Sequence, residues 1–309
     1  MPDPFHEGER AIQEITGERE AALANGRIIA DAVPVPAVPF VASQELAICS
    51  REDAEGRLWP GIVFGQKGFA SVSDDRRRLT IAPTGGAIAR GAPLDGLEVG
   101  DRLGSLFIEL TTRRRLRVNG TVEDLKEDRI QILIEEAYPS CPKYIQRRTM
   151  EPISDENAAA WHVESGTSLT EPLKSWIGKA DTMFVASGPQ GGRLDISHRG
   201  GEPGSIQVVD GLVRVPDYPG NSMFNNLGNF HLDPRAGLVF LDFTSGRQLS
   251  LTGSASVHVE GPAEGNASGP TGGTDRWWTF TPEAWTITNP EKARRWNAPE
   301  FFAVQPIRR

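Results

Sequence analysis

The run Asp195–Gly201, with the sequence DISHRGG, contains residue types that suit an anion. Its alternation predicts a short strand, and Ser197, His198 and Arg199 lie where that strand ends. A hydroxyl, a guanidinium fork and main-chain N–H groups at glycines can together bind phosphate oxygens. His198 either adds a donor or packs. For an isolated Ser-His-Arg, a solvated strand end with a surface arginine is the plainer interpretation.

Two further polar segments favour the anion site. Asp217–Ser222 follows an expected strand, Leu212–Val215, and forms a turn that offers a ring face, an amide and hydroxyls, although Tyr218 could instead cap a barrel. Another expected strand begins with the polar pair Arg247-Gln248. Because side chains alternate along a strand, one of the two points inward and the other toward a docked partner. The candidates added by these segments are Asp217, Tyr218, Asn221, Ser222, Arg247 and Gln248.

Motifs for other chemistry are missing from the sequence. The glycine-rich segment Gly188–Gly192 lacks the Lys-Ser/Thr of a phosphate loop and is interpreted as a hairpin loop. No metal-ligand spacing is present, and nothing marks a Ser/His/Asp or Cys/His set, although such residues could meet in space. We therefore predict no metal and assign no catalytic side chain.

Composition limits the partners of the chain. Its 309 residues include 33 Lys and Arg against 41 Asp and Glu, a formal charge of -8, so no overall positive field attracts nucleic acid or a membrane surface. The start of the sequence is typical of neither a signal peptide nor a membrane span, and the two cysteines suit a reducing compartment. We expect a cytoplasmic protein.

Helical and β-rich stretches alternate along the chain. Ile12, Ile15 and Leu23 predict an apolar stripe on an N-terminal helix. Short β-branched runs separated by Gly, Asp and Pro then appear twice, on either side of a more helical stretch. The predicted segments are 1–39 (N-terminal helix and Pro-rich arm), 40–150 (first β domain), 151–180 (helical connector) and 181–309 (second β domain, with a glycine-rich surface loop at 260–276).

The two β regions also resemble each other. GSLFIELTTRRRLRVNG at Gly104–Gly120 aligns without gaps on GLVFLDFTSGRQLSLTG at Gly237–Gly253, 133 residues further along. Glycine turns and apolar alternation can coincide by chance, but the aligned Arg114 and Arg247 favour an internal duplication. Many short strands in each copy predict a barrel or a sandwich.

Together these residues resemble the FMN-binding split barrels related to pyridoxamine 5′-phosphate oxidase, over roughly residues 40–148 and 181–259. The most specific marks are the SHRGG run and Cys141–Arg148, with the sequence CPKYIQRR. The resemblance implies a mainly β chain of two tandem six-stranded split β-barrels, which pack as an intrachain pseudo-dimer with FMN at their interface. Each half then supplies part of one pocket.

The resemblance also implies roles for the candidate residues. The SHR run would line the FMN phosphate and ribityl chain, the turn at 217–222 would cover it, and Arg247 and Gln248 would approach the flavin ring. Residues of the first half would reach across the interface. The residues expected to reach across are Lys143, Gln146 and Arg147.

The chain departs from the oxidase pattern in two places. Gly220-Asn221-Ser222 stands where an Arg-Lys pair is expected, and the tail from Trp285 lacks the Arg/His substrate signature. Oxidation of pyridoxamine phosphate is therefore not favoured. In the first half, Ile62-Val63 occupies the positions of His198-Arg199, so we expect one good FMN site per chain.

Three functions stay open at this point. The first is an FMN-dependent oxidoreductase, resembling a flavin reductase or oxidase, with a small-molecule substrate and NAD(P)H or a redox protein as electron donor. The second is a non-catalytic module that stores or senses a flavin or haem, and the third is a scaffold with a vestigial pocket. We favour the first, in a monomer with its internal pseudo-dimer or in a homodimer.

Overall fold

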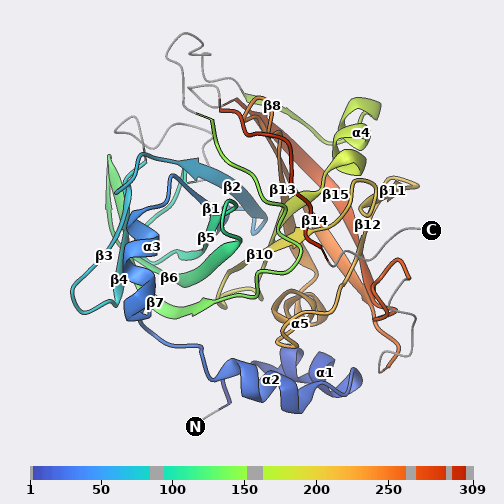
Figure 1. Ribbon diagram of the computed structural model, residues 1–309, viewed down its shortest axis with the longest axis horizontal. Coiled ribbons are helices and arrows are strands. Elements are labelled where there is room, and N and C mark those ends of the chain that lie inside the picture. The colour runs from blue at the N-terminus through green and yellow to red at the C-terminus, as the bar shows by residue number, and fades with distance from the viewer. Residues whose placement is uncertain (1–2, 84–93, 152–162, 262–268, 290–293, 304–309) are drawn as a thin grey trace.

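The computed structural model describes residues 3–83, 94–151, 163–261, 269–289 and 294–303, which form two curled antiparallel sheets (Figure 1). The first half contains α1 (Glu7–Ile15), α2 (Arg19–Gly26), η1 (Val35–Ala37), α3 (Val38–Ala42), β1 (Leu46–Glu52), β2 (Leu58–Phe64), β3 (Ala70–Val72), β4 (Arg78–Ile81), β5 (Arg102–Glu109), β6 (Arg114–Lys126) and β7 (Arg129–Pro139). The second half contains β8 (Val163–Gly166), α4 (Glu171–Lys179), β9 (Thr182–Ser187), β10 (Asp195–Gly200), β11 (Gln207–Val209), β12 (Leu212–Pro216), α5 (Asn225–Leu232), β13 (Arg235–Leu241), β14 (Gln248–His258) and β15 (Trp277–Thr288).

The two sheets have the same strand order. It is β2-β1-β5-β6-β7-β4-β3 in the first and β10-β9-β13-β14-β15-β12-β11 in the second, so every strand has a counterpart at the same place in the other half. The additional strand β8 pairs with β15. Among the described residues each path holds seven strands, where six were expected. The predicted fold class, mainly β with tandem split barrels, is confirmed.

A local irregularity repeats at equivalent places. The register of β6 against β7 shifts between Asn119 and Gly120, and that of β14 against β15 shifts between Thr252 and Gly253. A Cβ atom on either glycine would lie 2.0 Å from a carbonyl oxygen of the neighbouring strand, so each bulge requires a residue without a side chain. The two glycines are 133 residues apart, as the sequence alignment predicts.

Each barrel has its own apolar core, and a third cluster joins them. Phe107 and Leu116 lie in the first core, and Phe240 and Trp278 in the second. The third cluster combines residues of both halves, among them Ile48, Leu58, Phe184, Ile196 and Val239. Burial of this shared cluster holds the two barrels together.

The contact between the barrels is reciprocal. A Cβ atom on Gly104 of β5 would lie 3.1 Å from the carbonyl oxygen of Leu194, just before β10. A Cβ atom on Gly237 of β13 would lie 2.6 Å from the carbonyl oxygen of Leu58, the first residue of β2. Because β5 corresponds to β13 and β2 to β10, the same surface is used twice, as in a pseudo-dimer.

The N-terminal segment differs from the prediction. Two helices replace the single one, because Gly17 has a φ of 72° and ends α1. Ile12 is buried in the core of the second barrel, whereas Ile15 and Leu23 are 41% and 40% exposed, so the predicted three-residue stripe was wrong. Figure 1 shows α1 and α2 beside α5, to which α1 is packed.

Two other segments bear on the predictions. β8 and α4 lie in the predicted connector, of which residues 152–162 fall outside the described residues. The glycine-rich segment joins β14 to β15 as expected, with 262–268 outside the described residues, but its end is not a surface loop, since Thr274 and Arg276 are buried. Within the described residues, no helix combines the length and apolarity needed to span a membrane.

Candidate functional site

A cavity lies where β6 of the first barrel faces β10 of the second. It encloses about 1040 Å³ of empty space, including its open mouth. β6 contributes Arg115 and Arg117, and β10 contributes 197–200. Other parts of the wall come from the segment after β7, the segment that runs from β12 into α5, the N-terminal segment and the residue just before β15. The site therefore lies between the two halves, and both halves contribute residues to it.

Most of the predicted residues meet at this cavity, although their binding role stays a prediction. Gln146 lies behind the wall, where its Nε2 donates to the Gly201 carbonyl at 3.1 Å and its Oε1 accepts from the N–H of Phe302 at 2.9 Å. Arg147 is instead paired with Glu300 at 3.0 Å. The predicted residues that line the cavity are Lys143, Ser197, His198, Arg199, Asp217, Tyr218, Asn221 and Ser222.

The structure does not bring Arg247 and Gln248 to this cavity. Gln248 crosses to the first barrel, where its Nε2 donates to the carbonyl of Ile62 at 2.8 Å and its Oε1 accepts from the same residue's N–H at 2.7 Å. Arg247 Nε donates to Asn289 Oδ1 at 3.0 Å. The equivalent residue of the other half takes this place: Arg115, which aligns with Gln248, lines the cavity.

Arg117 joins the two barrels at the floor of the cavity. Its Nε lies 2.9 Å from Asp195 Oδ1, and its Nη2 donates to Ser197 Oγ at 2.5 Å. Its Nη1 donates to Tyr138 and to Asn225 Oδ1, the latter at 3.0 Å. Burial alone would lower the pKa of Arg117, but Asp195, Tyr138 and Glu136 together outweigh it and raise the pKa. Arg117 is thus a structural cation with its donors engaged.

Three other nitrogen atoms of cavity residues differ from those of Arg117 because they lack a hydrogen-bond partner in the described part of the chain. Arg115 Nε, His198 Nε2 and Arg199 Nε are buried, and no hydrogen-bond partner is found for them within the described part of the chain. Buried polar atoms are normally hydrogen-bonded, so these three nitrogen atoms are available to bind a ligand. The three atoms belong to residues of both barrels that line one cavity, as an anion site requires.

The electrostatics of these groups agree with that interpretation. Burial, with the charges of Arg115 and Arg199, holds the pKa of His198 well below its ordinary 6.5, so the imidazole is neutral near pH 7. Burial and the charge of Arg117 also lower the pKa of Arg115. Within the described residues Arg115 forms no ion pair, whereas Arg117 and Arg199 each lie near an aspartate, so an anion in the cavity would compensate the charge of Arg115.

The loop between β12 and α5 is held by acidic and basic side chains. Asp217 lies between two arginines, 3.2 Å from Arg276 Nε and 3.5 Å from Arg199 Nη2. Arg276 in turn reaches Glu18 Oε1 at 2.6 Å. On the other side, the Tyr144 hydroxyl donates to the carbonyl of Pro219 at 3.0 Å. The start of the loop is therefore held by Arg276, just before β15, and by Tyr144, in the segment after β7.

Sequence reasoning missed several cavity residues. One signal in the sequence could have pointed to Arg115, namely its alignment with Gln248. In a pseudo-dimer, the residue that faces β10 comes from the first half, so the candidate is Arg115 and not Gln248. Arg276 ends a low-complexity segment and Glu18 lies in the N-terminal segment, so neither had a local signal. The missed residues of greatest consequence are Glu18, Arg115, Arg117, Asn225, Asn226 and Arg276.

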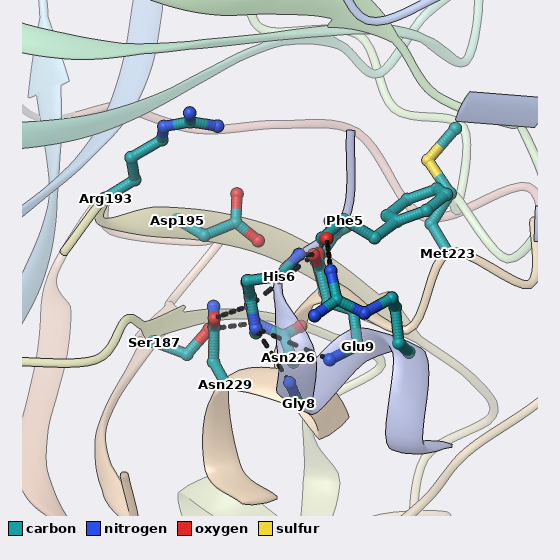
Figure 2. Close-up of polar contacts among 12 residues, drawn as sticks. Phe5, His6, Gly8, Glu9, Ser187, Arg193, Asp195, Met223, Asn226 and Asn229 are labelled. Atoms are coloured by element: carbon teal, nitrogen blue, oxygen red, sulfur yellow. Dashed lines mark hydrogen bonds and ion pairs between the residues drawn. The ribbon is translucent and has the colours of Figure 1, made fainter. Parts of the chain in front are cut away.

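A polar cluster lies behind the loop, between α1 and α5 (Figure 2). His6 Nε2 donates to Asn229 Oδ1 at 2.8 Å, and Glu9 accepts from the His6 N–H at 3.0 Å. Glu9 also accepts from Asn225 Nδ2 at 2.5 Å, and Asn225 lines the cavity. Burial raises the pKa of Glu9 to about 8, assisted by the negative charges of Glu136 and Asp195.

Comparison with known proteins gives only distant structural matches. No protein-family model and no curated protein matches the chain. HupZ from Group A Streptococcus matches 37% of this chain and 90% of its own length, at 16% identity and a TM-score of 0.29. A putative 5-nitroimidazole antibiotic resistance protein from Bacteroides thetaiotaomicron matches 47% of this chain and 99% of its own, at 10% identity and 0.28. The conserved hypothetical protein Rv2991 from Mycobacterium tuberculosis matches 42% and 85%, at 13% identity and 0.25.

Proposed function

We propose that the chain binds FMN in the cavity between its barrels and acts as an FMN-dependent oxidoreductase. The observation that carries this proposal is the convergence of three unpartnered donors, Arg115 Nε, His198 Nε2 and Arg199 Nε, from two barrels. The phosphate of FMN is a dianion with several acceptor oxygens, which matches two guanidinium groups and an imidazole. The sequence resemblance points to the same cofactor.

In this proposal the protein binds FMN, orients it and shields it from solvent. Arg115 and Arg199 would hold the phosphate, and His198, being neutral, would add one hydrogen bond without adding charge. The rings of Tyr144 and Tyr218, 5.0 Å apart, give the cavity wall an aromatic surface against which a flavin could lie. FMN itself supplies the transfer of hydride or electrons, with NAD(P)H or a redox protein as donor and a small molecule as substrate.

Absorbance spectroscopy of the purified protein tests this function. We expect flavin bands after reconstitution with FMN and bleaching of these bands on anaerobic addition of NADPH, NADH or a reduced redox protein, followed by recovery with an electron acceptor. A protein that stays colourless after reconstitution would contradict FMN binding. A flavin that is inert to every donor would instead indicate a storage or sensing role.

The equivalent position in the other half predicts the stoichiometry. There Ile62 replaces His198, and the side chain of Gln248 bonds both the N–H and the carbonyl of Ile62. No imidazole or charge remains at that position for a phosphate. We expect a fluorescence titration to saturate at one FMN per chain, and the same for a Gln248→Ala variant. Saturation at two would show that the second position also binds.

Haem binding is a second candidate, because His198 offers a neutral imidazole. Its Nε2 is buried and unpartnered in the described part of the chain, and a neutral ring nitrogen is the form that ligates iron. Titration with haemin separates the two candidates: a Soret band that is lost in His198→Ala would favour haem. A Soret band unchanged in that variant would argue against His198 as the ligand.

A further inference from the structure

We infer that Glu18 is a positioning residue of the FMN site, contributed by the N-terminal segment, residues 5–27. This inference rests on the proposed function. Glu18 lies at the N-terminal boundary of α2 and lines the cavity, more than 170 residues away in sequence from β10. One carboxylate oxygen accepts from Ser222 Oγ and the other from Arg276 Nη1, both at 2.6 Å. Glu18 therefore joins two separate parts of the cavity wall.

The loop that Glu18 holds has an unfavourable backbone. Ser222 has a φ of 62° and Phe224 a φ of 59°, a left-handed conformation that non-glycine residues rarely adopt. Such residues persist where surrounding contacts impose them. The N-terminal segment supplies those contacts: besides Glu18, Asn25 Nδ2 donates to the carbonyl of Asn221 at 2.8 Å and Gln13 Nε2 to that of Met223 at 3.0 Å.

Glu18 also begins a row of alternating charges that ends at a proposed phosphate ligand. Arg276, with a side chain 3% exposed, lies between Glu18 and Asp217. Asp217 lies between Arg276 and Arg199, and Arg199 Nη2 also donates to Asn226 Oδ1 at 3.2 Å. Without an acceptor at position 18, Arg276 Nη1 would lose its bond there, and the guanidinium would draw Asp217, its other carboxylate partner in the described part of the chain, away from Arg199. The guanidinium of Arg199 would then lose its orientation.

Two substitutions separate positioning from charge. Glu18→Gln removes the negative charge but keeps both contacts, because its amide oxygen can accept from Arg276 Nη1 and its NH2 can donate to Ser222 Oγ, whereas Glu18→Ala removes both. We expect the Kd for FMN, measured by fluorescence quenching, to rise about tenfold in Glu18→Ala and to change by less than about threefold in Glu18→Gln. The control is Glu20→Ala, an exposed glutamate on the same helix, which should leave the Kd unchanged.

Hydrogen exchange of the ligand-free protein gives a readout that does not need FMN. In Glu18→Ala we expect faster exchange of amides in residues 217–224 and no change in the strands of either barrel. Equal tightening of FMN binding in both Glu18 variants would mean that the residue is only a negative charge, and would overturn the inference. Unchanged loop exchange would also overturn it. A wild-type protein that binds no FMN contradicts the proposed function instead, and the exchange result then decides whether Glu18 positions the loop.

Discussion

Substituting Arg117 with methionine is expected to lower the free energy of unfolding by about 3–5 kcal/mol. The guanidinium lies in a buried ion pair with Asp195, and both side chains are less than one tenth exposed. Removing one member of such a pair leaves the other charge buried without compensation. Asp195 depends strongly on Arg117, because its Oδ2 has no hydrogen-bond partner within the described residues.

Urea denaturation followed by tryptophan fluorescence measures this effect. The matched control is Arg114→Met, three positions earlier on β6, where an arginine that is 61% exposed pairs with Glu109 and should contribute less than about 1 kcal/mol. Combining Arg117→Met with Asp195→Asn should cost much less than the sum of the single losses. Additive losses, or a loss under about 1 kcal/mol in Arg117→Met, would contradict the structural role of the pair.

The second large effect is a loss of stability as the pH rises, caused by Glu9. Its pKa is about 8 in the folded protein against an ordinary value of 4.5, so between these values the folded state holds a proton that the unfolded state has released. Stability therefore falls with rising pH across this window and the loss is complete above it. Between pH 6.5 and 8 the fall is on the order of 2 kcal/mol.

Neighbouring groups determine how this effect is measured. Burial raises the pKa of Glu136 and acts in the same direction, whereas burial lowers the pKa of His6, which makes stability rise with pH up to about the ordinary value of 6.5. We therefore compare wild type with Glu9→Gln, whose amide can still accept from Asn225, above pH 6.5. The variant should lose less stability than wild type between pH 6.5 and 8. Parallel curves would show that Glu9 does not carry the proton.

The strand framework could be predicted because its signals are local and repeated. Turn residues and alternation delimited the strands, and the alignment of Gly104–Gly120 with Gly237–Gly253 predicted the equivalence of β5 and β6 with β13 and β14. The N-terminal stripe failed because the chain turns at Gly17, and nothing in a single helical period shows that Ile15 and Leu23 face solvent.

The candidate site was only half predictable. Ser197–Arg199 and the turn after β12 are contiguous in sequence, so their polarity could be recognised. Arg115 and Glu18 reach the same cavity only through the packing of one half on the other and of the N-terminal segment on α5. Such pairings depend on distant parts of the chain. The polar character of Gln248 fits a cofactor site equally well in the sequence, but its side chain bonds the backbone of Ile62.

Comparing FMN with riboflavin tests the central claim most directly, because riboflavin has the same ring and lacks the phosphate. If the unpartnered donors of Arg115 and Arg199 hold a phosphate, wild type should bind FMN at least about a hundredfold more tightly than riboflavin. In Arg199→Ala this preference should fall to about tenfold or less, with riboflavin affinity little changed. Equal affinity of the wild type for both flavins, or a preference that survives loss of both arginines, would contradict the account.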